Sequence, residues 1–413
     1  MKYRIKAGYL IDGENPPKSN VQIDIEGKEI KNILRIKSKN INDKEEIFNK
    51  IINAEKYTVL PGLIDTHVHL TMNPEYVESW DKWLKEKKEI LLLKSTENAK
   101  RMLLSGVTTA RDCGAYGDLA FLLREIIERK LVSGPRLIIS GNPITITGGH
   151  CHYMGLEADN KKELIKSVRL MNKLSANFIK VMSTGGRMTT SSNARWVQYS
   201  LEETKAVVEE AHQRNMKVAV HALATEGIVN SVKASVDTIE HCAWMAPVDG
   251  FDLREEIIPE MVEKNIYVDP TLIAASIWLN RTSSSINATA IFEERMGLMK
   301  IMYQAGVKML AGTDAGVPKV DFDQLPFSIK LLADEIGLTN YDAIKAGTSE
   351  AARALGVDNE VGTVEKGKLA DIIIVNGNPL EDLEALKKIV MIIKDGDIVF
   401  QGNRDVLYHG LKK

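Results

Sequence analysis

The chain has 413 residues, which suits a large α/β domain that carries a smaller one. Its 54 basic and 56 acidic residues give a formal net charge of -2, so charge gives no reason to expect nucleic acid or an anionic membrane as a partner. The N-terminal sequence lacks an apolar signal region, and no stretch of about 18 uncharged apolar residues follows. We therefore expect a cytoplasmic protein with a small-molecule or dipeptide substrate.

The three cysteines, Cys113, Cys151 and Cys242, are too few and too scattered for a disulfide framework. So small a number of scattered cysteines agrees with a reducing compartment. Each cysteine lies near the end of an expected strand, so we expect small buried thiols.

The two ends of the chain predict one small β domain. Residues 1–58 read as short strands and polar turns, as in YRIKAGYLIDG and VQIDIEGKEIKNIL. Residues 362–413 return to this pattern, and Asp395-Gly396 between two apolar runs is a hairpin signal. We expect these two segments to form a composite β-sandwich domain.

The central residues, 59–361, alternate short apolar runs with amphipathic stretches long enough for helices. One such helix follows Ser200, which with Glu203 has the spacing of a capping box. Eight parallel strands with intervening helices predict an α/β fold of the (β/α)8 TIM barrel type, with an active site at the C-terminal strand ends. The expected strands are LPGLIDTHVHL, GVTTARDC, PRLIISG, NFIKVMS, MKVAVHA, VDTIEHC, NIYVDPT and VKMLAGTD.

The first of these strands ends with His67 and His69. Side chains two residues apart on a strand point to the same face, so the two imidazoles would lie side by side. This is the geometry of a metal clamp, although two polar residues at a solvent-facing strand end would give the same pattern.

Lys180 lies inside the apolar run NFIKVMS, where an unpaired ammonium is costly to bury. A buried salt bridge would explain this position. Alternatively, a neutral buried lysine can add carbon dioxide to become a carbamate, whose two oxygens can bridge two metal ions.

Three further polar residues end expected strands. His221 ends KVAVHA, His241 ends VDTIEH, and Asp314 ends MLAGTD. Each has an ordinary explanation, a hydrogen-bonded histidine or a helix cap. Together with the lysine and the first two histidines they favour a site for two divalent ions, with zinc expected. A metal-bridging hydroxide would then attack a carbonyl, and Asp314 would carry its proton to the leaving nitrogen.

These motifs resemble the amidohydrolase superfamily, in the branch of imidazolonepropionase-like proteins and bacterial Xaa-Pro dipeptidases. The resemblance spans nearly the whole chain. The motifs that carry it are PGLIDTHVHL, GVTTARDCG, GPRLIISG, ITGGHC, FIKVMSTGG, SLEETKAVVEEAH, KVAVHA, DTIEH, LAGTDAG and ALGVDNEVGTVEKGKLADIIIVNGNPL.

The resemblance implies that His67, His69 and Asp314 bind one metal ion. It implies that His221 and His241 bind a second, and that the carbamylated lysine bridges the two. The resemblance implies one metal ion and no bridging lysine for imidazolonepropionase itself, so the lysine in FIKVM favours the peptidase-like branch.

Substrate contacts are expected on two loops. His150 in ITGGHC could donate a hydrogen bond to a substrate carbonyl or carboxylate, since related enzymes direct this histidine toward the active site. Arg187 and Arg195, after the fourth strand, are the cations best placed to meet a substrate carboxylate. Arg111-Asp112 could form a supporting ion pair.

The expected function is hydrolysis of an amide bond by a Xaa-Pro-type dipeptidase or an N-acyl amino acid hydrolase. The first alternative is an imidazolonepropionase-like hydrolase of a cyclic amide. A non-catalytic scaffold that has lost its metals ranks lower, because every ligand position is filled. Lactone or phosphotriester hydrolysis also ranks lower, although the fold alone does not exclude it. Homo-oligomers are common in this family, so one is expected here.

Overall fold

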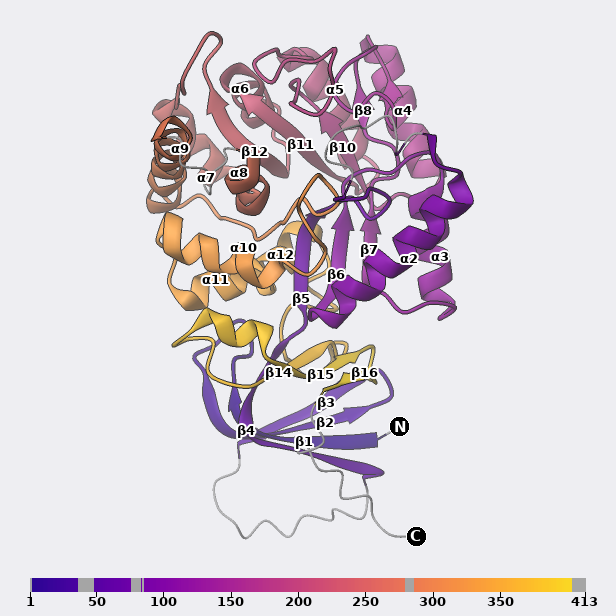
Figure 1. Cartoon of the computed structure of the whole chain (residues 1–413), viewed down its shortest axis with the longest axis vertical. Helices are drawn as coiled ribbons and strands as arrows, with labels where there is room; N and C mark the ends of the chain where they lie inside the picture. The colour runs from indigo at the N-terminus through magenta and orange to yellow at the C-terminus, as the bar shows by residue number, and fades with distance from the viewer. Residues whose placement is uncertain (1, 36–47, 76–82, 84, 279–285, 403–413) are drawn as a thin grey trace.

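The computed structural model describes residues 2–35, 48–75, 83, 85–278 and 286–402. Within these ranges a larger α/β part lies above a smaller β part (Figure 1). His409, which the sequence places at the surface of the C-terminal tail, lies outside the described residues.

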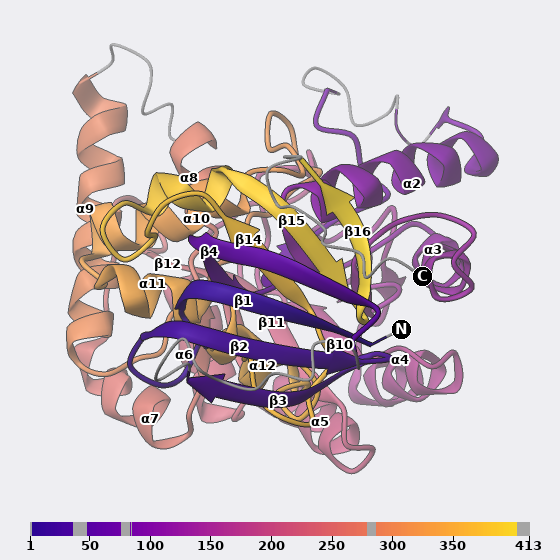
Figure 2. The ribbon, with the colours of Figure 1, turned by 90° about the horizontal axis from the view of Figure 1, so that it is seen from below.

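The smaller part is built from both ends of the chain. Its seven strands form one sheet in the order β16-β15-β14-β4-β1-β2-β3, and they lie side by side in Figure 2. Their bounds are β1 Lys2–Leu10, β2 Lys18–Glu26, β3 Glu29–Arg35, β4 Lys50–Pro61, β14 Ile372–Val375, β15 Ile389–Lys394 and β16 Asp397–Gln401. The two ends meet where β4 pairs antiparallel with β14. One cluster of buried aliphatic side chains from both ends forms the core of this part, which is consistent with the expected sandwich.

The expected hairpin at Asp395-Gly396 is confirmed. Lys394 pairs with Asp397, so the loop between β15 and β16 has two residues. Both residues have positive φ, 49° and 74°, as a type I′ turn requires.

The larger part contains parallel strands from the middle of the chain. One sheet has the order β5-β6-β7 and the other β13-β12-β11-β10-β8-β9. The bounds are β5 Leu63–Val68, β6 Val107–Asp112, β7 Arg136–Ile139, β8 Ile144–Thr145, β9 Leu156–Glu157, β10 Phe178–Met182, β11 Lys217–Ala224, β12 Thr238–Met245 and β13 Tyr267–Asp269. The eighth expected strand, VKMLAGTD, contributes a parallel bridge from Met309 to Val268 within the described residues.

Helices cover the outside of these strands (Figure 1). The predicted capping box is confirmed, because Ser200 Oγ accepts from the Glu203 backbone N–H and the Glu203 side chain accepts from the Ser200 N–H. The bounds are α2 Lys88–Leu104, α3 Leu119–Glu128, α4 Lys161–Lys173, α5 Leu201–His212, α6 Thr225–Lys233, η2 Glu255–Ile257, α7 Ile258–Glu263, α8 Leu272–Trp278, α9 Ile286–Gln304, α10 Leu325–Leu331, η3 Leu332–Ile336, α11 Asn340–Ala346, α12 Ser349–Leu355 and η4 Leu383–Lys387. Among the helices that the structure describes, none has both the length and the apolar character needed to span a bilayer.

Two features join the parts. At Gly62, between β4 and β5, a Cβ atom would lie 2.1 Å from Thr108 Oγ1, so only glycine lets the chain pass this close to β6. Arg136 on β7 binds carboxylates of the smaller part, Asp371 and Asp395, each at 2.6 Å.

We expect Arg136→Met to lower the free energy of unfolding by at least ~2 kcal/mol, since removing one partner of a buried ion pair costs about 3–5 kcal/mol and Arg136 retains some exposure. Urea unfolding followed by fluorescence measures the change. The control is Arg129→Met, which removes an exposed i,i+4 pair with Glu125. Equal midpoints for the two variants would contradict a role for Arg136 in joining the parts.

Candidate active site

One cavity lies at the C-terminal ends of the parallel strands. Histidine, arginine, lysine and aspartate side chains line it together with apolar ones. The sequence-predicted site residues that line it are His67, His69, His150, Lys180, Arg187, His221, His241 and Asp314.

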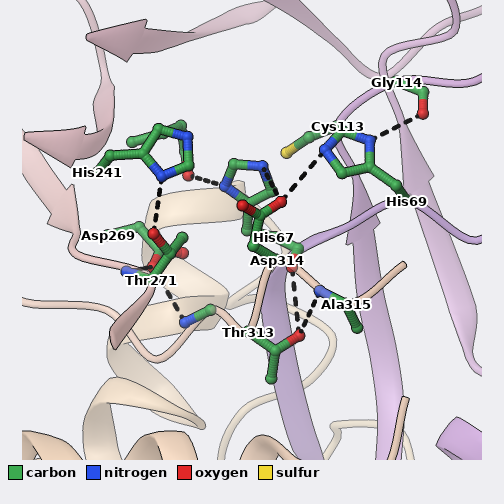
Figure 3. A network of polar contacts seen from close by, with 12 residues as sticks. His67, His69, Cys113, Gly114, His241, Asp269, Thr271, Thr313, Asp314 and Ala315 are labelled. Carbon is green, nitrogen blue, oxygen red and sulfur yellow. Dashed lines mark hydrogen bonds and ion pairs between the residues drawn. The ribbon is translucent and has the colours of Figure 1, made fainter. Parts of the chain in front are cut away.

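His67, His69 and Asp314 form the tightest group. Their ligand atoms lie within 4.8 Å of one another, and all three side chains are buried. Asp314 Oδ1 lies 3.5 Å from His67 Nε2 and 3.4 Å from His69 Nε2, and the three point toward one another in Figure 3. Burial acts to raise the pKa of Asp314, but the neighbouring His67 and His69 hold it below its usual value. An ionised carboxylate beside two imidazole nitrogens is a suitable set of metal ligands.

Partners behind the two rings fix their orientation. His67 Nδ1 lies 2.7 Å from Glu240 Oε2, and His69 Nδ1 lies 3.0 Å from the Gly114 carbonyl oxygen. Both contacts leave the Nε2 atoms facing Asp314. Such outer contacts set which nitrogen of a ligating histidine carries its proton.

Glu240 is fully buried and is itself held by Arg111, whose Nη2 donates to Glu240 Oε1 at 2.6 Å. The supporting ion pair of Arg111 is therefore with Glu240 on β12. Asp112 instead accepts from the backbone N–H groups of Leu70 and Gly114. Arg111 reaches the site through Glu240 and His67.

His221 and His241 form the second group of imidazoles, with ring centroids 4.6 Å apart. His241 Nδ1 lies 2.7 Å from Thr271 Oγ1, and His221 Nε2 lies 3.1 Å from the Gly185 carbonyl oxygen. Burial holds the pKa of both histidines well below the usual value. The rings are therefore neutral near pH 7, the form in which imidazole binds metals.

Backbone strain marks three of these positions. Asp314, His241 and Thr271 have φ of 63°, 65° and 44°, in the left-handed region that non-glycine residues rarely adopt. The Asp314 N–H donates to the His67 carbonyl oxygen at 2.8 Å, which holds the aspartate against β5. Strain of this kind persists where the surroundings enforce it and is typical of functional sites.

Lys180 lines the cavity, with 1% of its surface exposed. Its Nζ has no hydrogen-bond partner within the described residues. The salt bridge that would explain a buried lysine is therefore not formed among them. A buried amine without a hydrogen-bond partner is costly unless a nearby charge or a bound group compensates it.

A second possible ligand group consists of His67, Cys113 and Glu240. Glu240 is already engaged by Arg111, and burial raises the pKa of the Cys113 thiol. A protonated thiol is a poor ligand. All three cysteines are free and buried, which confirms their expected role as small buried thiols.

His150 is buried in the cavity wall, with its ring 4.5 Å from that of His221. Burial lowers the pKa of His150 to about 3, so the ring is neutral near pH 7. At Gly186, a Cβ atom would lie 2.3 Å from the His150 ring, so the loop after β10 can pass over the imidazole only as glycine. His152 lies outside the cavity lining and His212 pairs with Asp237 at 2.9 Å.

The two predicted arginines have different positions. Arg187 lines the cavity, and it has no polar partner in the part of the chain that the structure describes. Arg195 lies outside the lining and donates to the carbonyl oxygens of Ala246 and Gly250. It therefore ties the loop after β10 to the loop after β12.

Sequence reasoning missed Glu240, Thr271 and Arg295. Glu240 gave the same signal as Lys180, a charged residue inside an apolar strand, and could have been found that way. Thr271 follows β13 by two residues and is recognisable only once His241 is placed. Arg295 lies on α9 among charged residues, and nothing in its local sequence separates it from a solvent-exposed arginine.

The Amidohydrolase family model matches residues 58–399. A solved structure of a Xaa-Pro dipeptidase with methionine bound in its active site is 32% identical, covers 97% of this chain and 100% of that one, and superposes with a TM-score of 0.83. Ochratoxinase of Aspergillus niger is 26% identical over 96% of this chain and 86% of its own length. Imidazolonepropionase of Shouchella clausii is 24% identical over 86% of this chain and 79% of its own length.

The family match covers most of the chain, including every strand-end residue described above. The resemblance inferred from the motifs is thereby confirmed. The chain belongs to the amidohydrolase family.

Proposed function

We propose that this protein is a metal-dependent hydrolase of amide bonds, acting on a dipeptide or an N-acyl amino acid. The observation that carries the proposal is the unpartnered Nζ of buried Lys180, which shares one cavity with four imidazoles and Asp314. Family membership supports a hydrolase.

The residues present fit two divalent ions. Asp314 and the Nε2 atoms of His67 and His69 would hold one ion, while His221 and His241 would hold the other. Lys180 as a carbamate would supply two oxygens between them, which accounts for an amine that has no protein partner. When bound, such ions lower the pKa of a water molecule and polarise a carbonyl.

Side chains of the protein itself can transfer the proton during hydrolysis. Water adds its oxygen to the carbonyl carbon, the C–N bond breaks, and the amine leaves with a proton. Asp314 Oδ1, directed into the cavity, is placed to accept the proton from water and return it to the nitrogen. His150, which is neutral, has a ring N–H to donate to the substrate.

One of the relatives favours a peptide-like substrate. The Xaa-Pro dipeptidase structure holds methionine, an amino acid, in its active site. Imidazolonepropionase, which would imply a cyclic amide, is also a relative. Lys180 argues against an imidazolonepropionase-like site with one metal ion, because such a site would leave the Lys180 Nζ without a partner.

Four finer expectations from the sequence remain proposals: a closed eight-stranded barrel, domain boundaries near residues 58 and 362, zinc as the metal, and a cytoplasmic homo-oligomer. Three backbone bonds of 2.8 Å support the barrel. The Asn177 N–H donates to the Ile139 carbonyl oxygen and links the start of β10 to β7. The Leu310 N–H donates to the Val268 carbonyl oxygen and links the VKMLAGTD segment to β13. The Asp314 N–H donates to the His67 carbonyl oxygen and links that segment to β5.

Replacing Asp314 with Asn is expected to lower kcat by at least ~100-fold, because the amide cannot accept the proton and general acid–base catalysis contributes about 10²–10⁴-fold. Ninhydrin detection of released amino acid measures the rate. Circular dichroism controls for folding. A near-normal rate would remove Asp314 from the proton-transfer role.

Replacing Lys180 with Ala is expected to remove the bridge and most of the bound metal. Elemental analysis of the purified protein gives the metal content, with about two ions per chain expected before the substitution. The matched control, Lys217→Ala, lies on the next strand and pairs with Asp237 outside the cavity. Two ions per chain with full activity in Lys180→Ala would contradict the carbamate.

Glu240→Gln is expected to weaken metal binding about 10–100-fold, because loss of the charge loosens the contact that orients His67. Competition with a chelator measures the affinity. Glu226→Gln, an exposed substitution of the same kind, provides the comparison. Unchanged affinity would mean that Arg111 and Glu240 do not position the ring.

A further inference from the structure

The charged side chains of the cavity are unevenly distributed. Apart from the histidines, Asp314 is its acidic lining residue, whereas Lys180, Arg187 and Arg295 are basic. If Lys180 becomes a carbamate, two arginines remain that the metal site does not use. A cavity with this excess of positive charge favours an anionic substrate.

Arg295 is buried, with 7% of its surface exposed. Its Nη2 donates to the His241 carbonyl oxygen at 2.8 Å and to the Pro270 carbonyl oxygen at 3.0 Å. Its Nε has no partner within the described residues, although the residue lines the cavity. The carbonyl groups of His241 in β12 and of Pro270 just after β13 thus fix the guanidinium, and its Nε donor is left unused.

Arg187 provides a second guanidinium with free donors on the loop after β10. Arg187 and Arg295 line the same cavity, although they come from different elements of the chain. Two cations that share one cavity repel, and an anion bound by both would relieve the repulsion. A carboxylate matches the planar donors of arginine.

The cavity also has an apolar part of its lining. Four methionines form what we call the methionine wall, Met72, Met154, Met182 and Met188. They follow or end strands β5, β8 and β10 and pack with Trp83. Methionine side chains are apolar and adapt to ligands of different shape.

We propose that the cavity selects an N-acyl amino acid whose free carboxylate binds between Arg187 and Arg295 and whose acyl group is long, apolar and packed on the methionine wall. This inference rests on the proposed function. The amide carbonyl would then lie between the two subsites, beside the imidazoles and Asp314. The carboxylate belongs to the amine product and the apolar chain to the acid product.

Calorimetric binding to the Asp314→Asn holoenzyme tests the carboxylate subsite without turnover. N-hexanoyl-L-leucine is expected to bind at least 10-fold more tightly than N-hexanoyl-L-leucinamide. Adding Arg187→Gln should remove this difference by weakening only the acid, and Arg295→Lys should reduce it because the planar fork is lost. Arg129→Gln, on the surface, should change neither Kd. Equal binding of acid and amide would overturn the proposal.

Hydrolysis by the wild-type enzyme tests the methionine wall. The kcat/KM for N-hexanoyl-L-leucine is expected to exceed that for N-acetyl-L-leucine by at least 10-fold. Met188→Ser, on the partly exposed edge of the wall, should reduce this ratio, whereas Val248→Ser on an exposed loop should not. A ratio near one in the wild type would overturn the apolar part of the proposal.

The two hypotheses fail in different ways. Tight, carboxylate-dependent binding of N-hexanoyl-L-leucine without its hydrolysis would contradict the proposed function and support the carboxylate subsite. Hydrolysis of acid and amide at equal kcat/KM would support the amide hydrolase and overturn the arginine pair.

Discussion

The site depends on burying one lysine without a partner. Lys180 is among the largest fully buried side chains, and every residue of β10 around it is buried. An uncompensated buried charge costs several kcal/mol. The neighbouring imidazoles of His67 and His241 cannot offset it, because an imidazole is either neutral or cationic. Compensation must come from Asp314 or from a bound group, and this requirement favours chemistry that converts the amine into an anion.

The same strand ends that present the candidate metal ligands also lock them in place. The chain of contacts from Arg111 through Glu240 to His67 crosses β6, β12 and β5, so the orientation of one imidazole depends on three strands. Thr271 after β13 does the same for His241. Rings fixed this way lose little entropy on binding a metal, and preorganisation is what a hydrolytic site requires. The strained φ angles at Asp314 and His241 show that the fold enforces this arrangement.

The sequence predicted the features that depend on neighbouring residues, and it missed those that depend on contacts between residues distant in the chain. The period of two in β5 predicted that His67 and His69 share a face, and the apolar run around Lys180 predicted its burial. The strand-end histidines could be found in this way because each belongs to a local pattern. Arg295 and the methionine wall could not, because their positions depend on how α9 and the loops pack over the strands. Arg195 had the local features of a substrate contact, but the backbone carbonyls that engage it belong to a distant loop.

The groups proposed for the reaction and those proposed for specificity therefore lie on different parts of the chain. Groups suited to bond cleavage come from strand ends, whose positions the hydrogen-bonded strands fix. Those suited to substrate choice, Arg187, Met188 and Arg295, come from the loop after β10 and from α9. A substitution on those elements can change the substrate without disturbing the ligands, because it breaks no strand pairing. Arg295 is the exception: its bond to the His241 carbonyl oxygen couples the candidate carboxylate site to a candidate metal ligand. Binding of the substrate anion there would act directly on the segment that holds His241 in its strained conformation.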